Sequence, residues 1–233
     1  LRHKLGLLGL LLLAILPTVL EPLEALTLAT AYFTAMFAMS WDVVSGYTGQ
    51  ISLGHGVFFT AGGYTSTLLN IEFGFDPLVS IPLGVIVAVV AGLLIGIPTL
   101  RLRGPYFSLV TLIAPLILLR IFIVYSDILG GTVGLNRPES LFGLHASDAV
   151  QVYYVAFGLF VLVLSILLAV TRSNAGMVFS AIRQSEDAVS SAGLNPAKFK
   201  LFAFVLSGAV GGLAGAMFVH SSVGNPLNPQ KIL

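Results

Sequence analysis

The sequence has very little charge. Only 9% of its 233 residues are charged and 57% are hydrophobic, and its mean hydropathy is +0.99. Soluble domains carry about 25% charged residues, so this chain lacks the polar surface that a water-facing globule needs. Several stretches with almost no charge are long enough to cross a hydrocarbon core about 30 Å thick. The composition therefore predicts a polytopic integral membrane protein.

The sequence also lacks the residues that several kinds of chemistry require. The sequence contains no cysteine, which excludes disulfides and thiolate metal sites. It contains no Gly-x-x-x-x-Gly-Lys-Ser/Thr loop, so we expect that it does not itself bind ATP in the usual way. His55 has no histidine or carboxylate three or four residues further on, and His220-Ser221-Ser222 has no matching partner motif. We therefore predict no catalytic residues, no metal site and no cofactor.

Hydropathy predicts an all-α bundle of about seven membrane-spanning helices. The first apolar run precedes no small-x-small cleavage site, so we interpret it as a retained helix rather than a signal peptide. No soluble domain separates the spans, and we expect a single transmembrane domain over residues 1–233. The polar, proline-broken stretch "SSVGNPLNPQKIL" suggests a C-terminal truncation with further spans missing. The predicted helices lie at about 5–20, 25–45, 51–70, 78–100, 104–126, 150–171 and 201–221.

The distribution of basic residues predicts the orientation of these spans. Cytoplasmic loops of membrane proteins are enriched in lysine and arginine. With the N-terminus in the cytoplasm, the inner segments hold far more basic residues than the outer ones, so we expect this orientation. The inner set is Arg2, Lys4, Arg101, Arg103, Arg172, Arg183, Lys198 and Lys200, and the outer set is Arg137 and Lys231.

The segment "SWDVVSGYTGQISLGHGVFF", residues 40–59, places polar residues and glycines where a span favours leucine. Polar groups inside a membrane usually have a function, and irregular backbone is tolerated there only when it is buried in protein or lines a watery cavity. We expect the polar side chains, Asp42 included, to face the interior, and glycines such as Gly62 and Gly63 to make close helix contacts. The candidate residues of a substrate path or gate are Gly46, Tyr47, Gln50, Ser52 and His55.

A second segment, "PTLRLRGPYFSLVTLIAP", combines basic and polar residues at the start of a span. Arg101 and Arg103 lie at a predicted cytoplasmic boundary, where basic residues anchor a helix and meet lipid phosphates. Tyr106 and Thr111 give the following helix a polar trace, and Pro115 predicts a kink. We add Tyr106 and Thr111 to the candidate path.

The longest predicted cytoplasmic loop, residues 172–200, contains an amphipathic pattern. It predicts one short helix from Gly176 to Gly193, with Gly193 as the C-terminal cap and Pro196 shortly beyond it. A helix lying on a membrane surface would be rich in lysine and arginine. This helix mixes basic and acidic residues and has small apolar ones, so docking into a groove of another protein is favoured over membrane binding.

These segments, in this order, resemble the inner-membrane permease subunits of branched-chain amino acid ABC transporters, of the LivM type. The resemblance covers nearly the whole chain from about residue 30. It is carried by "GYTGQISLGHGVFFTAGGYTSTLL", "LRLRGPYFSLVTL", "GGTVGL" and "GMVFSAIRQSEDAVSSAGLNPAKFKLFAFVLSGAVGGLAGAM". The run Asp187-Ala188-Val189-x-x-x-Gly193 is a loose form of the Glu-Ala-Ala-x-x-x-Gly loop of importer permeases, from which it departs at two leading positions.

The resemblance implies a subunit of an importer in a prokaryotic plasma membrane. A second permease would complete the pore, two cytoplasmic ATP-binding subunits would supply energy, and an extracytoplasmic binding protein would deliver the substrate. ATP would be bound by the partner subunits only. Membrane lipid is a further implied partner, and nucleic acid is not one. The residues implied to couple with an ATPase are Ala181, Arg183, Glu186, Asp187, Ala188 and Gly193.

Other functions remain open at the level of sequence. Related permeases carry urea, short amides or other amino acids, and these patterns separate them poorly. An ion-coupled secondary transporter would need a paired acid and base within its spans. Asp42 and Arg120 are the near-central candidates, and they lie on different predicted helices with no partner motif.

Overall fold

The computed structural model describes residues 2–99, 105–131, 134–136 and 138–221. In these ranges the chain forms helices joined by turns and loops and has no strand, which confirms the all-α prediction. Arg101 and Arg103, and the polar stretch from residue 222 onward, lie outside the described residues. The α-helices are α1 Arg2–Ile15, α2 Pro22–Asp42, α3 Gly56–Phe73, α4 Pro77–Thr99, α5 Pro105–Val124, α6 Ser126–Leu129, α7 Ala149–Thr171, α8 Asn174–Gln184, α9 Glu186–Ser191 and α10 Pro196–His220.

Five of the described helices are long and apolar enough to cross a membrane: α2 with its extension to Tyr47, α4, α5 from Tyr106, α7 and α10. The other two predicted spans correspond to α1 and α3. Helix α1 has 14 residues and is therefore only about 21 Å long. Helix α3 has 18 residues, but threonine, serine and asparagine side chains lie along it. The count of seven spans thus stays a prediction.

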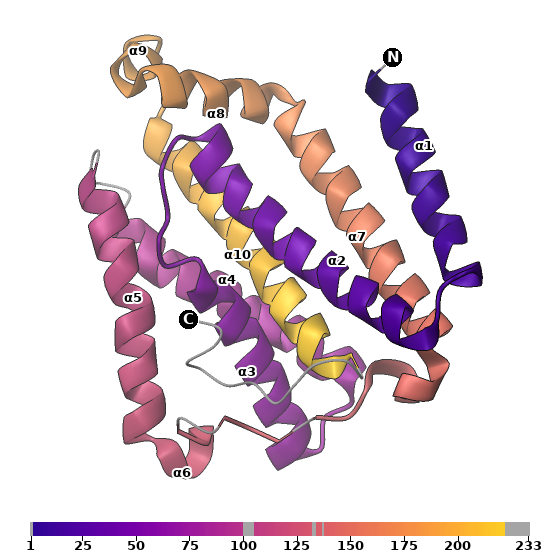
Figure 1. Ribbon diagram of the computed structural model, residues 1–233. Helices are drawn as coiled ribbons and strands as arrows, with labels where there is room; N and C mark the ends of the chain where they lie inside the picture. The colour runs from indigo at the N-terminus through magenta and orange to yellow at the C-terminus, as the bar shows by residue number, and fades with distance from the viewer. Residues whose placement is uncertain (1, 100–104, 132–133, 137, 222–233) are drawn as a thin grey trace.

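Helix α10 forms the centre of the bundle. It packs against α2 on one side and against α3 and α4 on the other (Figure 1). The backbones approach closely: a Cβ atom added to Gly62 would lie 2.1 Å from the carbonyl oxygen of Gly212. The interpretation of Gly62 as a helix-contact residue is confirmed. Small residues allow such approach between membrane helices, where the gain comes from van der Waals packing.

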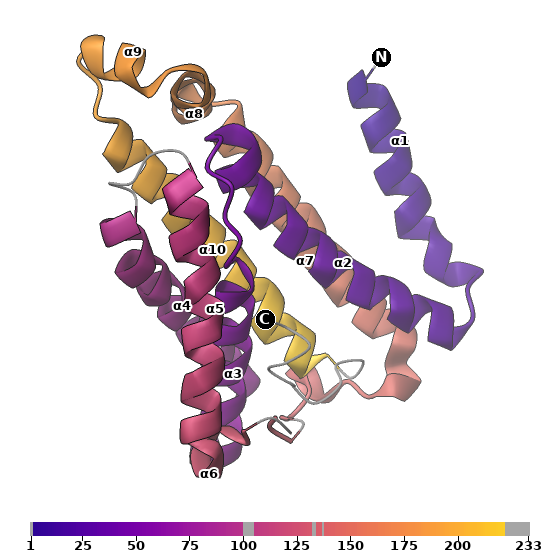
Figure 2. The same cartoon turned by 60° about the vertical axis from the view of Figure 1, so that its left-hand side comes forward.

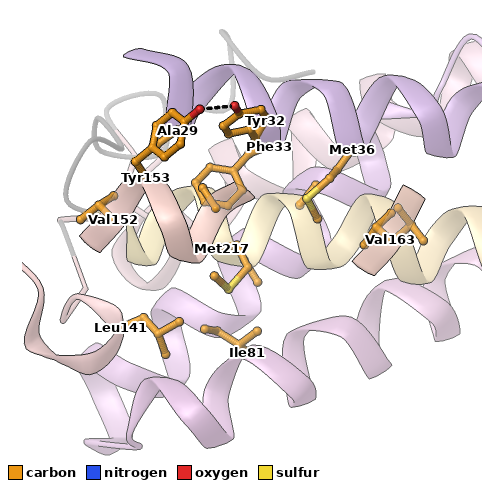
Figure 3. Packing of buried hydrophobic residues seen from close by; sticks show 14 of the residues in the cluster. Ala29, Tyr32, Phe33, Met36, Ile81, Leu141, Val152, Tyr153, Val163 and Met217 are labelled. Carbon is orange, nitrogen blue, oxygen red and sulfur yellow. Dashed lines mark hydrogen bonds between the residues drawn. The ribbon is translucent and has the colours of Figure 1, made fainter. Parts of the chain in front are cut away.

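A second packing centre joins α2 to α7. Tyr32 and Tyr153 are buried, and their hydroxyl oxygens lie 2.6 Å apart (Figure 3). The Tyr153 hydroxyl donates to the carbonyl oxygen of Leu13 at 2.6 Å. Because a phenol has one proton, Tyr32 must donate to Tyr153. This relay attaches the end of α1 to the bundle.

Helices α1 and α5 lie at opposite edges of the molecule (Figure 1). Helices α8 and α9 lie at one end of the bundle, and the short α6 lies at the other (Figure 2). Helix α5 begins near the α8–α9 end and finishes at α6 (Figure 1). The two ends thus correspond to the two sides of a membrane that the long helices would cross.

Candidate functional site

The amphipathic loop forms two helices, so the prediction of one helix from Gly176 to Gly193 is wrong. Ser185 has extended backbone angles, φ −159° and ψ 107°, which end α8. Its side chain accepts a hydrogen bond from the backbone N–H of Ala188 and so caps α9. Serine followed by acidic residues is a typical helix start, and this local signal overrides the longer periodicity. Gly193 follows α9 with φ +82°, as its predicted capping role requires.

Helices α8 and α9 press an apolar side against the bundle and expose the other. Phe179, Ile182 and Val189 are buried. Five of the six predicted coupling residues are exposed on the outside of this end, along α8, α9 and the turn that follows: Ala181, Arg183, Asp187, Ala188 and Gly193.

Two of the predicted coupling residues make contacts within the chain. The Glu186 carboxylate forms a salt bridge with the Lys200 ammonium, with 2.6 Å between Oε2 and Nζ. The Lys200 side chain is only 3% exposed, so this pair fixes α9 to the first turns of α10. The Arg183 Nη1 donates to the carbonyl oxygen of Gly46 at 2.6 Å. Arg183 therefore joins α8 to the glycine-rich segment after α2.

The glycine-rich segment leaves α2 through a π-helical turn, Val43–Tyr47, and runs without helix to His55. The prediction of a helix from residue 51 is wrong, because α3 begins at Gly56. Gly49 has φ +75°, and a Cβ atom there would lie 2.9 Å from Cγ of Arg183. Glycine is the residue that adopts this backbone conformation readily. The segment can therefore pass directly beneath the Arg183 side chain.

Hydrogen bonds hold the glycine-rich segment in a fixed path. The Trp41 Nε1 donates to the carbonyl oxygen of Ser52 at 2.8 Å. The Ser45 hydroxyl donates to the carbonyl oxygen of Gln50 at 3.2 Å and accepts from the Ser52 N–H at 3.2 Å. Irregular backbone within a membrane protein must find such partners, since lipid offers none.

The same segment holds α5. The Ser108 hydroxyl donates to the carbonyl oxygen of Ile51 at 2.7 Å, and the Leu53 N–H donates to Thr111 Oγ1 at 3.1 Å. A Cβ atom at Gly54 would lie only 1.9 Å from the Thr111 carbonyl oxygen. Contacts thus continue from Arg183 on α8, through the segment from Gly46 to Gly54, to the first turns of α5.

The predicted path residues lie in different environments. Gly46 and Tyr47 line an open cleft of about 580 Å³ with Arg183 and three more residues, namely Asp42, Ser180 and Gln184. Ser52, His55 and Thr111 are buried, Gln50 is half-buried, and Tyr106 is 65% exposed on α5.

One expectation about this region is wrong. Asp42 was expected to face the interior, but it is exposed at the rim of the cleft. It is the last residue of α2, where the helix end meets α8, and there a carboxylate keeps its solvation.

His55 lies in a closed cluster rather than at a cavity wall. Its Nε2 is 2.8 Å from the Ser40 hydroxyl and 3.2 Å from the Ser207 hydroxyl. Each serine donates its single proton to a backbone carbonyl, of Phe37 and of Ser40 respectively. The Nε2 of His55 must therefore carry the hydrogen. Its Nδ1 is buried and has no hydrogen-bond partner among the described residues.

A second histidine cluster lies at the C-terminal end of α10, beyond Ser207 in the middle of that helix. The Nδ1 of His220 is 2.6 Å from the carbonyl oxygen of Glu139, so this nitrogen donates. Its Nε2 is 2.5 Å from the Ser66 hydroxyl, which must then be the donor. The Ser80 hydroxyl lies 3.4 Å from the same nitrogen. His220 thus has the opposite tautomer to His55 and joins α3, α4 and α10 to the loop around Glu139.

The His220 cluster was not predicted, because the histidine and its neighbouring serines have no partner motif nearby in the sequence. The partners, Ser66 and Ser80, precede His220 by 154 and 140 residues. The available signal was a serine within each of two apolar helices, Ser66 on α3 and Ser80 on α4. This signal does not specify which helices contact one another.

Similarity to known proteins identifies the family of this chain. Residues 24–232 match the family described as branched-chain amino acid transport system / permease component. The chain belongs to this family of membrane transport permeases.

Similarity to individual proteins supports the same family. The chain is 32% identical over 93% of its length to a high-affinity branched-chain amino acid transport system permease protein, LivM, of Salmonella typhimurium, of which the match covers 57%. The values for LivM of Escherichia coli are the same. A probable branched-chain amino acid transport permease protein, LivH, of Methanocaldococcus jannaschii is 27% identical over 70% of this chain and 54% of its own length.

The chain therefore spans a little over half the length of these curated relatives. No solved structure matches it significantly.

Proposed function

We propose that this chain is the permease subunit of an ABC importer and forms part of the path for the branched-chain amino acids leucine, isoleucine and valine. Its family and its apolar helices support a multi-pass membrane transport protein. The names of its relatives support branched-chain amino acids as substrates. The chain acts with a second permease, two cytoplasmic ATP-binding subunits and an extracytoplasmic binding protein, and ATP binds to the partner subunits only.

The observation that carries the coupling role is the Arg183–Gly46 hydrogen bond. Helices α8 and α9 expose Ala181, Asp187 and Ala188, with Met177 64% exposed and Leu194 44% exposed beside them. A helix with exposed apolar and charged residues suits a groove in a protein partner. When an ATPase displaces α8, the displacement passes through Arg183 to the glycine-rich segment, and through Ser108 and Thr111 to α5.

The proposed orientation places α8 and α9 in the cytoplasm, together with the N-terminus, in a prokaryotic plasma membrane. Only this side exposes the coupling helices to the ATP-binding subunits. The excess of basic residues in the inner segments supports the same orientation. Substrate then enters from the end where α6 lies and leaves toward α8.

Co-purification in detergent tests this function. The full-length permease, expressed with its candidate ATP-binding subunits, should retain them, and Asp187→Arg should release them. The matched control is Glu72→Arg, a charge reversal at an exposed position at the end of α3. The control should retain the complex. If the wild-type permease captures no ATP-binding subunit, the importer function is wrong.

A further inference from the structure

Arg120 is an isolated charge within a membrane helix. It is the only arginine in the five candidate spans of the described chain. Its side chain is exposed and forms no ion pair or hydrogen bond with any residue that the structure describes. Leu116 and Val124, one turn to either side, are 57% and 72% exposed. The guanidinium therefore projects from an apolar surface, and neither the bundle nor a polar loop accounts for it.

A charge facing lipid carries a cost. Insertion measurements give about 2.5–3.5 kcal/mol for arginine at the centre of a membrane helix, and the cost is smaller nearer the helix ends, where Arg120 lies. Arginines in spans almost always face a bundle interior or a water-filled cavity. Helix α5 has room for such a partner, because only 22% of the residues in its most apolar stretch are buried, compared with 67% in α10. Helix α7 is similarly open, at 17%, but it contains no charged residue. The Arg120 side of α5 is thus open to something outside this chain.

The place of α5 in the coupling pathway indicates what it faces. Its first turns are bonded to the segment that Arg183 holds, so α5 is an exposed helix that follows movements of α8. A helix that moves with α8 and has one side exposed is suited to form a wall of the transport path. Arg120 is four residues before the C-terminal end of α5. That end of the helix lies beside α6 (Figure 1), which is the side of substrate entry in the proposed orientation.

We propose that Arg120 binds the carboxylate of the transported amino acid in the path between this chain and the second permease. This inference rests on the proposed importer function and names the substrate contact within it. A guanidinium pairs with a carboxylate through two parallel hydrogen bonds. The neighbouring Leu116, Ile117 and Val124 provide an apolar surface beside it, which matches a zwitterion with an aliphatic side chain. The chain thereby recognises both features of a branched-chain amino acid at one place.

A lipid phosphate is the competing partner, since arginines near helix ends extend toward headgroups. Arg120 is four residues before the end of α5 at Val124, about 6 Å along the axis. The two environments differ in access. A side chain in the path is reached by water-soluble reagents, whereas one that faces acyl chains is not.

The absence of cysteine from these 233 residues makes a direct test possible. Arg120→Cys is introduced into the full-length permease and assembled with partner subunits that lack accessible cysteines. The complex is reconstituted into liposomes and treated with sulfonatoethyl or aminoethyl methanethiosulfonate. The first adds an anion and does not cross membranes, and the second restores a cation. The control is Leu162→Cys on α7, where the native side chain is 54% exposed.

The sulfonate reagent should modify Arg120→Cys and leave Leu162→Cys unmodified, and leucine with the binding protein should slow the reaction. ATP-driven leucine uptake should fall about tenfold in Arg120→Cys, as expected for the loss of one charge-assisted contact. The aminoethyl reagent should restore much of this uptake, and the sulfonate reagent should not.

Two results would overturn the inference. If Arg120→Cys resists the sulfonate reagent as Leu162→Cys does, the position faces lipid. If both reagents change uptake equally, the cation is not what the substrate requires. Uptake by the wild-type complex is measured in parallel. A wild type without ATP-driven uptake counts against the importer function, whereas a failure confined to Arg120→Cys counts against this site alone.

Discussion

Helices α10 and α5 are both long and apolar enough to cross a membrane, but they are held by different means. Helix α10 is enclosed by α2, α3 and α4, with backbones in direct contact at its glycines. Helix α5 is held at its start by two hydrogen bonds: Ser108 donates to the glycine-rich segment, and Thr111 accepts from it. Near its other end, Phe122 stacks on Tyr64 of α3, with 4.3 Å between the ring centroids, and most of the helix is otherwise exposed.

This difference separates a fixed part of the molecule from a part that can move. Dense packing without voids resists displacement because many contacts change together. Helix α5 instead has two hydrogen bonds near its start and one aromatic stack near its end, so fewer contacts resist its displacement. We therefore expect α10 to determine whether the protein folds and α5 to determine whether it transports.

Gly62→Val should have the largest effect. The added Cβ would lie 2.1 Å from the Gly212 carbonyl oxygen, and the backbone there cannot move without separating α3 from α10. Overpacking of this kind costs about 1–3 kcal/mol or more, so little monodisperse protein should be recovered in detergent. The control is Gly158→Val on α7, where nothing lies within 4 Å of an added Cβ. Equal yields of the two variants would show that α3 and α10 are not in close contact.

The two histidine clusters along α10 should contribute differently to stability. His220→Ala removes bonds to both ring nitrogens, whereas His55→Ala removes bonds to one, its Nδ1 having no partner in the described chain. A net hydrogen bond contributes about 1 kcal/mol, and a buried group left unpaired costs about 1–3 kcal/mol. The midpoint of thermal unfolding should therefore fall more in His220→Ala.

Two further substitutions of His55 test which ring nitrogen carries the hydrogen. Glutamine places an amide N–H near the position of Nε2, and asparagine places one near Nδ1. His55→Gln should therefore retain more stability than His55→Asn. A midpoint that is equal in these two variants, or higher in His55→Asn, would contradict the assignment of the hydrogen to Nε2.

Ser108→Ala with Thr111→Val should separate transport from assembly. Both substitutions keep the size of the side chain approximately, and they remove the bonds that attach α5 to the glycine-rich segment. ATP-driven uptake should fall roughly tenfold, the equivalent of one or two hydrogen bonds, while the ATP-binding subunits stay bound. Ser165→Ala is the control, because Ser165 on α7 bonds only within its own helix. Normal uptake by the double variant would remove α5 from the coupling pathway.

Apolar runs and capping residues were enough to predict most helices, because hydropathy and caps are local properties. The stop at Gly193 illustrates the caps. The predicted start of the last span at residue 201 was late, because charged Lys198 and Lys200 obscured the first turn of α10. Lys200 is tolerated there because Glu186 pairs with it, and a single sequence does not reveal that pairing.

The candidate site was predicted less completely than the fold. Glycine content and polarity identified the segment after α2, and the amphipathic pattern identified α8 and α9. Neither pattern showed that Arg183 contacts Gly46 across 137 residues, or that His55 is enclosed by serines. Such contacts depend on helix packing and leave no periodic signal in the chain. The roles of the predicted residues in the path stay predictions.

Tyr153→Phe should have the smallest effect, and it extends the comparison to α1. The substitution leaves the ring in place but removes the hydroxyl that accepts from Tyr32 and donates to Leu13. The Tyr32 hydroxyl is then buried without its acceptor, so unfolding should become easier by about 1–2 kcal/mol. The double variant Tyr32→Phe with Tyr153→Phe removes both hydroxyls and should recover part of this loss. Because α1 is otherwise at the edge of the bundle, protease cleavage between α1 and α2 should increase in both variants. Unchanged cleavage would show that α1 is held without the tyrosine relay. The remaining contacts are the hydrogen bond from the Tyr154 hydroxyl to the Ala14 carbonyl oxygen at 3.1 Å and those around Pro17, which is buried beside α7.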